Sequence, residues 1–120
     1  MRPFVLCLSA AALAVLAARA AHADEAANTA DLRCLSVAVI AANSPDPKQQ
    51  AAAAASVMYW IGRLDGRNPG FNLEKRFADT ISKMTADDLR NEAARCRAAL
   101  KVRANALMEM TKQMSAPGDE

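Results

Sequence analysis

The stretch DPKQQAAAAASVMYWIGRLDG, residues 46–66, decides the fold class. It opens with a helix start signature, because Asp46 is a good N-cap, Pro47 suits the first helical position and Gln49 stands where a capping-box partner belongs. The alanines that follow have the highest helix propensity of all residues, and Gly66 offers a left-handed exit. The stretch therefore predicts a helix that ends near Gly66. Its buried stripe is expected at spacings of three, four and three residues: Ala54, Val57, Ile61 and Leu64.

Another helix is predicted on the N-terminal side, from a Thr29 cap to about Ala42. Pro45 ends the helical region, because proline disfavours helical geometry in the residue before it. Small residues, Cys34 among them, give this helix an apolar face. Ser36 is expected to point toward water.

Two more helices are predicted on the C-terminal side. Asn72 caps the shorter one after the turn at residues 68–70, and Thr85, with Asp88 three residues later, opens one of up to about 28 residues. The apolar stripe of the long helix is interrupted once, by Arg103, and its heptad-like spacing suits antiparallel helix packing as well as a coiled coil. Its members are Leu89, Ala93, Cys96, Leu100, Leu107, Met110 and Met114. No run of alternating β-branched or aromatic residues predicts a strand, so the expected fold class is all-α, a small four-helix domain.

The N-terminus has the pattern of a secretory signal peptide. Arg2 supplies the charged start, residues 4–16 the apolar run, and Ala21-His22-Ala23 a small-x-small cleavage site. The apolar run is shorter than the roughly 20 residues that cross a membrane, so cleavage is expected rather than stable membrane anchoring. The exported chain would lie in the periplasm or outside the cell. Its expected parts after the signal peptide (1–23) are a flexible lead (24–30), the four-helix domain (31–114) and a flexible tail (115–120).

Cleavage also changes the charge balance. The 15 Lys and Arg residues of the full chain fall to 13 once Arg2 and Arg19 are removed, which equals the 13 Asp and Glu residues. The net charge of the exported chain is then zero, so no overall basic attraction to nucleic acid survives. We expect the partner to be another protein.

Cys34 and Cys96 are the even pair that remains after Cys7 leaves with the signal peptide. In an oxidising compartment such a pair predicts one disulfide, and a separation of 62 residues matches neither zinc-ligand spacing nor the C-x-x-C redox motif. This disulfide would join the first and fourth helices.

Residues needed for most catalytic chemistry are missing. His22 is the only histidine and leaves with the signal peptide, so no Ser-His pair, imidazole base or histidine metal site is expected. Glycine-rich phosphate loops and the C-x-x-C-H haem motif do not occur. Asp87 and Asp88 form an adjacent carboxylate pair, but their place in the first turn of a helix explains them as dipole and capping residues. We therefore expect no enzyme, no catalytic or metal-ligating residues and no cofactor.

Residues 59–66 hold the only tyrosine and tryptophan of the chain. Adjacent helical positions point about 100° apart, so both rings cannot face one stripe. One interpretation is a recognition patch, formed by Tyr59, Trp60, Arg63 and Asp65. The other is structural, with Trp60 beside the core, Tyr59 at its rim and Gly62 receiving a neighbouring helix.

The long helix also carries a basic face, whose members fall within about 60° of one another in projection: Arg90, Arg97, Lys101 and Lys112. No acidic residue is expected in that sector. The face is interpreted either as a surface for an acidic partner or as a solvated side of the helix.

These features together resemble a group of uncharacterised small secreted helical proteins of proteobacteria. The resemblance covers Leu32 to Leu100 and rests on a cysteine in each outer helix and on the aromatic-aromatic-x-Gly-Arg-x-Asp-Gly segment at residues 59–66. It implies export and a helical fold, and no particular activity. By architecture the chain is also similar to periplasmic acid-stress chaperones of the HdeA type. Its cysteine separation and alanine-rich helix depart from that family, so no functional residues are carried over.

The sequence thus predicts a small exported binding or interaction protein without catalysis. One alternative is a periplasmic stress chaperone that loosens at low pH and exposes its methionines, since methionine-rich surfaces adapt to many partners. Another alternative is an inhibitor or immunity-type protein that binds one exported enzyme tightly.

Overall fold

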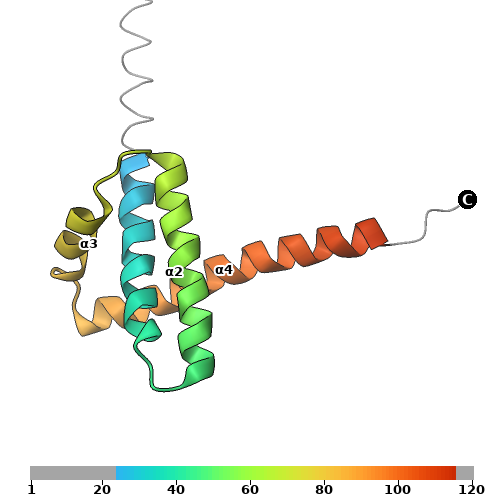
Figure 1. The fold of residues 1–120 in the computed structure, drawn as a ribbon, viewed down its shortest axis with the longest axis horizontal. Helices are drawn as coiled ribbons and strands as arrows, with labels where there is room; N and C mark the ends of the chain where they lie inside the picture. The colour runs from blue at the N-terminus through green and yellow to red at the C-terminus, as the bar shows by residue number, and fades with distance from the viewer. Residues whose placement is uncertain (1–23, 116–120) are drawn as a thin grey trace, which may run out of the picture.

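A computed structural model describes residues 24–115, and in this part of the chain it contains four helices and no strand. The first helix covers residues 24–42, and it is followed by α2 (Pro47–Arg67), α3 (Leu73–Ile81) and α4 (Ala86–Ser115). The first helix and α2 lie side by side as an antiparallel hairpin, which α4 crosses (Figure 1). The predicted all-α four-helix fold is confirmed. The predicted signal peptide and the tail from residue 116 lie outside the described residues.

The N-terminal end of α2 is capped as predicted, but without a capping box. The Asp46 carboxylate accepts a hydrogen bond from the Lys48 N–H at 2.9 Å, and Pro47 is the first helical residue. Gln49 does not reach back to the cap; its side-chain oxygen accepts from the Ser44 hydroxyl, whose oxygen also accepts from the Asp46 N–H. The Ser44 hydroxyl therefore accepts the hydrogen bond from the Asp46 N–H that the sequence pattern assigned to Gln49.

The C-terminal end of α2 differs from the prediction. The helix continues through Gly66 to Arg67, and the glycine in the left-handed region is Gly70, with φ of 91° in the following turn. The Asn68 N–H donates to the Leu64 carbonyl at 3.0 Å, which closes the last helical turn without a glycine cap. Gly66 therefore needs no conformation that an alanine could not adopt.

The first helix begins earlier than the predicted Thr29 cap. Residues 24–28 are already helical, and Asn28 is buried, so the expected flexible lead forms part of the packed hairpin instead. Ser36, expected to face water, is fully buried, and its hydroxyl donates to the Leu32 carbonyl at 3.0 Å. This local hydrogen bond satisfies the hydroxyl, which makes its burial inexpensive.

The core lies where the hairpin meets α4, and Trp60 is its largest buried side chain, with 2% of its surface exposed. The predicted stripe of α2 is confirmed at Leu64, which is buried, and Val57 and Ile61 pack against the core. It is wrong at Ala54, which is exposed, because the helix is rotated so that Ala53 and Trp60 face inward. Burying Trp60 removes more apolar surface from water than any neighbouring residue could, which favours this rotation. The remaining core residues are Leu32, Cys34, Leu35, Ala38 and Cys96.

Both predicted starts on the C-terminal side are confirmed. The Asn72 side chain accepts from the Lys75 N–H at 3.1 Å at the start of α3. Before α4, Asp88 accepts from the Thr85 N–H at 2.9 Å, and the Thr85 hydroxyl oxygen accepts from the Asp88 N–H at 3.1 Å. This reciprocal pair is a capping box.

The second half of α4 leaves the domain. Leu100 still packs against the core, but every residue from 101 to 115 is exposed. This part, which we call the projecting segment, extends away from the other helices (Figure 1). The predicted burial of Leu107, Met110 and Met114 is therefore wrong for the single chain, because the hairpin is too narrow to cover a 30-residue helix that crosses it.

Candidate functional site

The disulfide between Cys34 and Cys96 is present, with a Cα–Cα distance of 5.5 Å. Both residues are buried, one in the middle of the first helix and the other in the first half of α4. The predicted link between the outer helices is confirmed. It fixes the point at which α4 crosses the hairpin.

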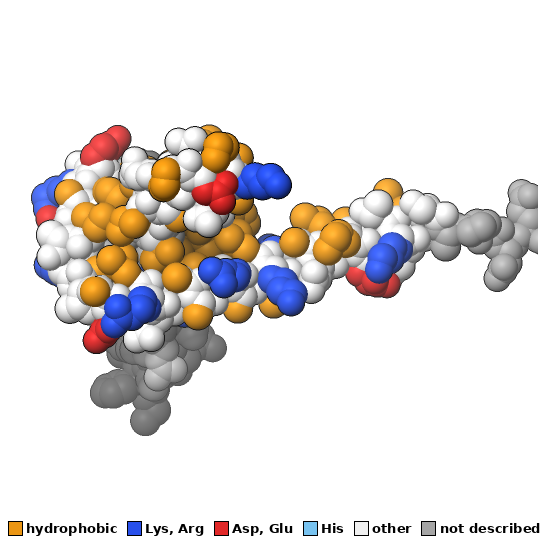
Figure 2. Space-filling view, turned by 90° about the horizontal axis from the view of Figure 1, so that it is seen from below, with side chains coloured by type: hydrophobic (Ala, Val, Ile, Leu, Met, Phe, Trp, Pro, Cys, Tyr) orange, Lys and Arg blue, Asp and Glu red, His pale blue; other side chains and the backbone are white. Residues whose placement is uncertain are grey.

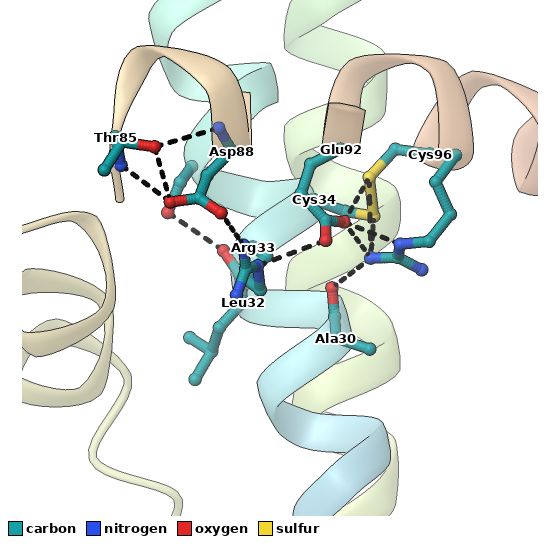
Figure 3. A network of polar contacts seen from close by, with 10 residues as sticks. Ala30, Leu32, Arg33, Cys34, Thr85, Asp88, Glu92 and Cys96 are labelled. Atoms are coloured by element: carbon teal, nitrogen blue, oxygen red, sulfur yellow. Dashed lines mark hydrogen bonds and ion pairs between the residues drawn. A yellow bond between two sulfur atoms is a disulfide. The ribbon is translucent and has the colours of Figure 1, made fainter. Parts of the chain in front are cut away.

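A polar cluster surrounds this crossing point (Figure 3). The Arg33 guanidinium lies 2.9 Å from Asp88 Oδ1 and 3.1 Å from Glu92 Oε1. The contact with Glu92 is an ion pair rather than a well-aligned hydrogen bond, because Arg33 Nε lacks a partner with hydrogen-bond geometry. Arg95 completes the cluster: it donates to Glu92 at 2.6 Å and to the Ala30 carbonyl at 2.8 Å.

The Asp88 carboxylate of this cluster is held in its charged form. Hydrogen bonds from the Thr85 backbone and hydroxyl lower the pKa of Asp88, and Arg33 lowers it further. Glu92 forms ion pairs with the guanidinium groups of Arg33 and Arg95. Through Arg33, both carboxylates join α4 to the first helix.

Cys34, Glu92 and Cys96 also place their ligand-type atoms within 4.8 Å of one another. The two sulfur atoms are joined to each other, so neither is the thiolate that a zinc or copper site requires. In the oxidised protein the trio offers a single carboxylate, which is already paired with two arginines.

The predicted recognition patch does not form one exposed surface. Trp60 is buried, and the half-buried Tyr59 ring meets it edge-on at a centroid distance of 4.8 Å. The Arg63 guanidinium lies over both rings, 5.8 Å from the Tyr59 centroid and 5.5 Å from that of Trp60. Gly62 receives no neighbouring helix, because a Cβ there would meet no atom within 4 Å. The aromatic pair therefore belongs to the core and its rim.

Arg63 instead takes part in an ion-pair network between α2 and the first helix. The buried Asp31 carboxylate accepts from Arg63 Nε at 2.9 Å and from an Arg67 amino group at 2.8 Å. The other amino group of Arg67 donates to the Asn28 side chain at 2.7 Å. The sequence analysis missed this network. Arginines at i and i+4 on one helix facing Asn and Asp at i and i+3 on another were the signal that could have found it.

Asp65 is exposed on the opposite side of α2 from this network, and within residues 24–115 it forms no ion pair. Neither Arg63 nor Arg67 pairs with it, because both arginines bind Asp31.

The predicted basic face is divided by ion pairs along α4. Arg90 pairs with Asp87, and Lys112 pairs with Glu109, so the two outer charges of the face are each matched by a carboxylate from beside the sector. Arg97 and Lys101 remain exposed in the middle, where the structure gives them no acidic partner among the described residues. Two adjacent positive charges are a local feature, not an extended basic surface.

A groove of about 540 Å³ lies between the first helix, α2 and α4. Its apolar lining includes Trp60, Leu100 and the disulfide, and Arg97 also borders it. Figure 2 shows hydrophobic side chains gathered on this face of the hairpin and again along the projecting segment. The alanines that line the groove come from all three helices: Ala38, Ala41, Ala52, Ala53 and Ala93. Small side chains here leave room for another backbone to approach closely.

The projecting segment continues from the edge of this groove. Large apolar side chains are exposed along it, with Leu107 at 61% and Met108 at 55%. The others are Val102, Met110 and Met114. Sequence analysis identified most of the stripe but placed it in the core, so the exposed face was found only in the structure. Groove and segment share Leu100 as their common border.

No family model matches the chain, and neither a curated protein nor a solved structure matches it. Among residues 24–115, no helix is both long enough and apolar enough to cross a membrane.

Proposed function

We propose that this chain is an exported, non-catalytic interaction protein that binds another protein through the groove and the projecting segment. The observation that carries the proposal is the apolar surface that lines the groove up to Leu100 and, after the interruption at Arg103, follows the projecting segment to Met114. Apolar surface of this extent on a small domain is typical of a binding site.

The shape of the groove favours a helix as the bound element. Alanines line it on three sides, and helices pack most closely where the contacting side chains are small. Recognition of an amphipathic helix in an apolar groove is a common mode of protein interaction. Arg97 and Lys101, at the border between groove and segment, would favour an acidic residue on the rim of the partner.

The absence of catalysis is supported by the chemistry of the residues. His22 is the only histidine of the chain and belongs to the predicted signal peptide. The clustered carboxylates Asp31, Asp88 and Glu92 are each paired with arginine. Export is supported by the N-terminal pattern and is compatible with the disulfide.

A stress chaperone is the second candidate, and the exposed methionines favour it. Met108, Met110 and Met114 lie on one short stretch of helix, and flexible thioether side chains adapt to many partners. An inhibitor or immunity-type protein would differ by binding one enzyme in a fixed ratio.

Pull-down of the chain from residue 24 onward, from a periplasmic extract at neutral and at acidic pH, separates these functions. Ala52→Arg places a charged side chain in the groove at an exposed position, and Ala54→Arg is the matched control on the opposite side of α2. We expect a bound protein that Ala52→Arg loses and Ala54→Arg keeps. Equal capture by both variants would contradict the groove as the binding site. Capture of many unrelated proteins at acidic pH would favour the chaperone.

A further inference from the structure

The apolar stripe of α4 keeps a heptad spacing across the boundary of the domain. Its residues alternate at intervals of three and four from Ala93 to Met114. The positions are Ala93, Cys96, Leu100, Arg103, Leu107, Met110 and Met114. The first three face the core or the groove of their own chain, and the last four lie on the projecting segment. A stripe with a period of 3.5 residues is the pattern by which two helices pack along their length.

Within residues 24–115 this segment packs against no other helix. All of residues 101–115 are exposed, so the described part of the chain gives this helical stretch no buried contact. Isolated helices of this length are marginal in water, and exposed leucine and methionine side chains add the cost of hydrating apolar surface. A second helix with a matching stripe removes both costs.

We propose that this second helix is the projecting segment of another copy of the chain, so that two copies form an antiparallel helix pair. The inference rests on the proposed interaction function and names a partner for the outer part of the same surface. A two-fold arrangement makes the contact closed, because each stripe covers the other and no apolar edge remains for further copies.

Charge decides the direction of the two helices. In a parallel pair Arg103 of one copy would face Arg103 of the other within the apolar seam, and like charges in such a seam repel. An antiparallel pair that sets Leu107 against Met110 of the partner sets Arg103 against Met114. The arginine stem then lies on the methionine while its guanidinium reaches water at the edge of the pair.

The flanking positions permit close contact in this arrangement. Residues beside the stripe are small or uncharged: Ala104, Ala106, Thr111 and Gln113. They introduce no repulsion between the helices. The positive half of the segment, with Lys101 and Arg103, also lies beside the partner's half, in which Glu109 and Lys112 offset each other and the negative end of the helix dipole remains.

The end of the partner helix lies close to the groove. With Arg103 beside the partner's Met114, the last residue of the partner's α4, Ser115, lies beside Val102, two positions from Leu100 at the border of the groove. Two short segments alone bury less than the roughly 1,200 Å² of a stable interface, so we expect a dimer of modest, micromolar affinity.

Analytical ultracentrifugation of the oxidised chain from residue 24 onward tests the proposal. Between about 10 and about 500 µM we expect the mass to rise from one chain toward two, since dimer formation follows mass action. Leu107→Glu, within the stripe, should weaken self-association by about tenfold or more. Met108→Glu is the matched control, because its side chain is similarly exposed but lies outside the stripe.

The direction of the pair is tested by crosslinking. Ala104→Cys chains mixed with Thr111→Cys chains should give mixed crosslinked dimers with a short bis-maleimide. Ala104→Cys chains alone should give few, because in this register their thiols lie about 13 Å apart along the helices, whereas a parallel pair would crosslink them with one another. Circular dichroism checks that each variant keeps the fold, which we expect because the substituted residues are exposed. A single-chain mass at every concentration, or equal loss in the Met108→Glu control, would overturn the homodimer. Either result would leave the Ala52-dependent capture of another protein intact, so the two proposals can fail separately.

Discussion

Asp31 on the first helix accepts a 2.8 Å hydrogen bond from Arg67 at the end of α2, and the same carboxylate oxygen accepts from Arg63 one turn earlier. Asp31 is buried, whereas both arginines reach partly into water. The pair joins the two helices at the end of the hairpin that is distant from their connecting loop. It also explains why two arginines follow the aromatic residues of α2.

Replacing Asp31 with asparagine should destabilise the fold by about 2 kcal/mol, because the two guanidinium groups lose their charged acceptor but can still be hydrated in part. Urea denaturation followed by circular dichroism measures the loss. The matched control is Asp65→Asn, an exposed carboxylate on α2, the helix that carries Arg63 and Arg67, which we expect to change stability by less than about 0.5 kcal/mol. Similar losses in both variants would refute a specific role for Asp31.

Trp60→Ala should cost about 3 to 5 kcal/mol, because it leaves a cavity where the hairpin meets α4. Met58→Ala, two residues earlier and 68% exposed, should be nearly neutral. Circular dichroism must be the probe, since Trp60 is the only tryptophan of the chain. If Trp60→Ala kept the stability of the wild type, the structural role of Trp60 would be refuted and its interpretation as part of the recognition patch would be favoured.

Reduction of the disulfide, or the double change Cys34→Ala and Cys96→Ala, should lower the free energy of unfolding by about 4 kcal/mol on the chain-entropy model. The loop that the bond closes is long, with a sequence separation of 62 residues. Denaturation with and without reductant gives the difference, and alkylation before reduction should modify neither cysteine. An unchanged denaturation midpoint after complete reduction would show that the bond does not restrain α4.

Asp88 should make stability depend on pH in the acidic range. Its pKa is lowered in the folded chain by the Thr85 hydrogen bonds and by Arg33, so the charged form stabilises the fold. That contribution to stability is fully present above the ordinary aspartate pKa of about 3.9. It is lost as the pH falls through the lower pKa that Asp88 has in the folded chain. Wild type should therefore exceed Asp88→Asn in stability at neutral pH, and the gap should shrink below about pH 4. A gap that stays constant down to about pH 2 would contradict this assignment.

Much of the local structure could be read from the sequence. The caps at Asp46, Asn72 and Thr85 were predicted because each acts on backbone groups within one helical turn. Cysteine counting also gave the right pair, since only Cys34 and Cys96 follow the signal pattern. The candidate site was predicted less well: most of the apolar stripe of α4 was identified, but the groove beside it was not.

Local signals in the chain were thus sufficient for the four helices, most of their ends and the disulfide, because these depend on neighbours in the sequence or on a simple count. The buried face of α2, the acceptor of Arg63 and the point where α4 leaves the core depended on contacts between distant residues. Trp60 faces inward because Leu32, Cys34 and Cys96 surround it, and Arg63 binds Asp31 because the hairpin brings them together. Leu107 is exposed because the hairpin is narrower than α4 is long. Hydrophobic spacing shows which side of a helix requires a partner, but only the packing of the whole chain shows whether that partner is present.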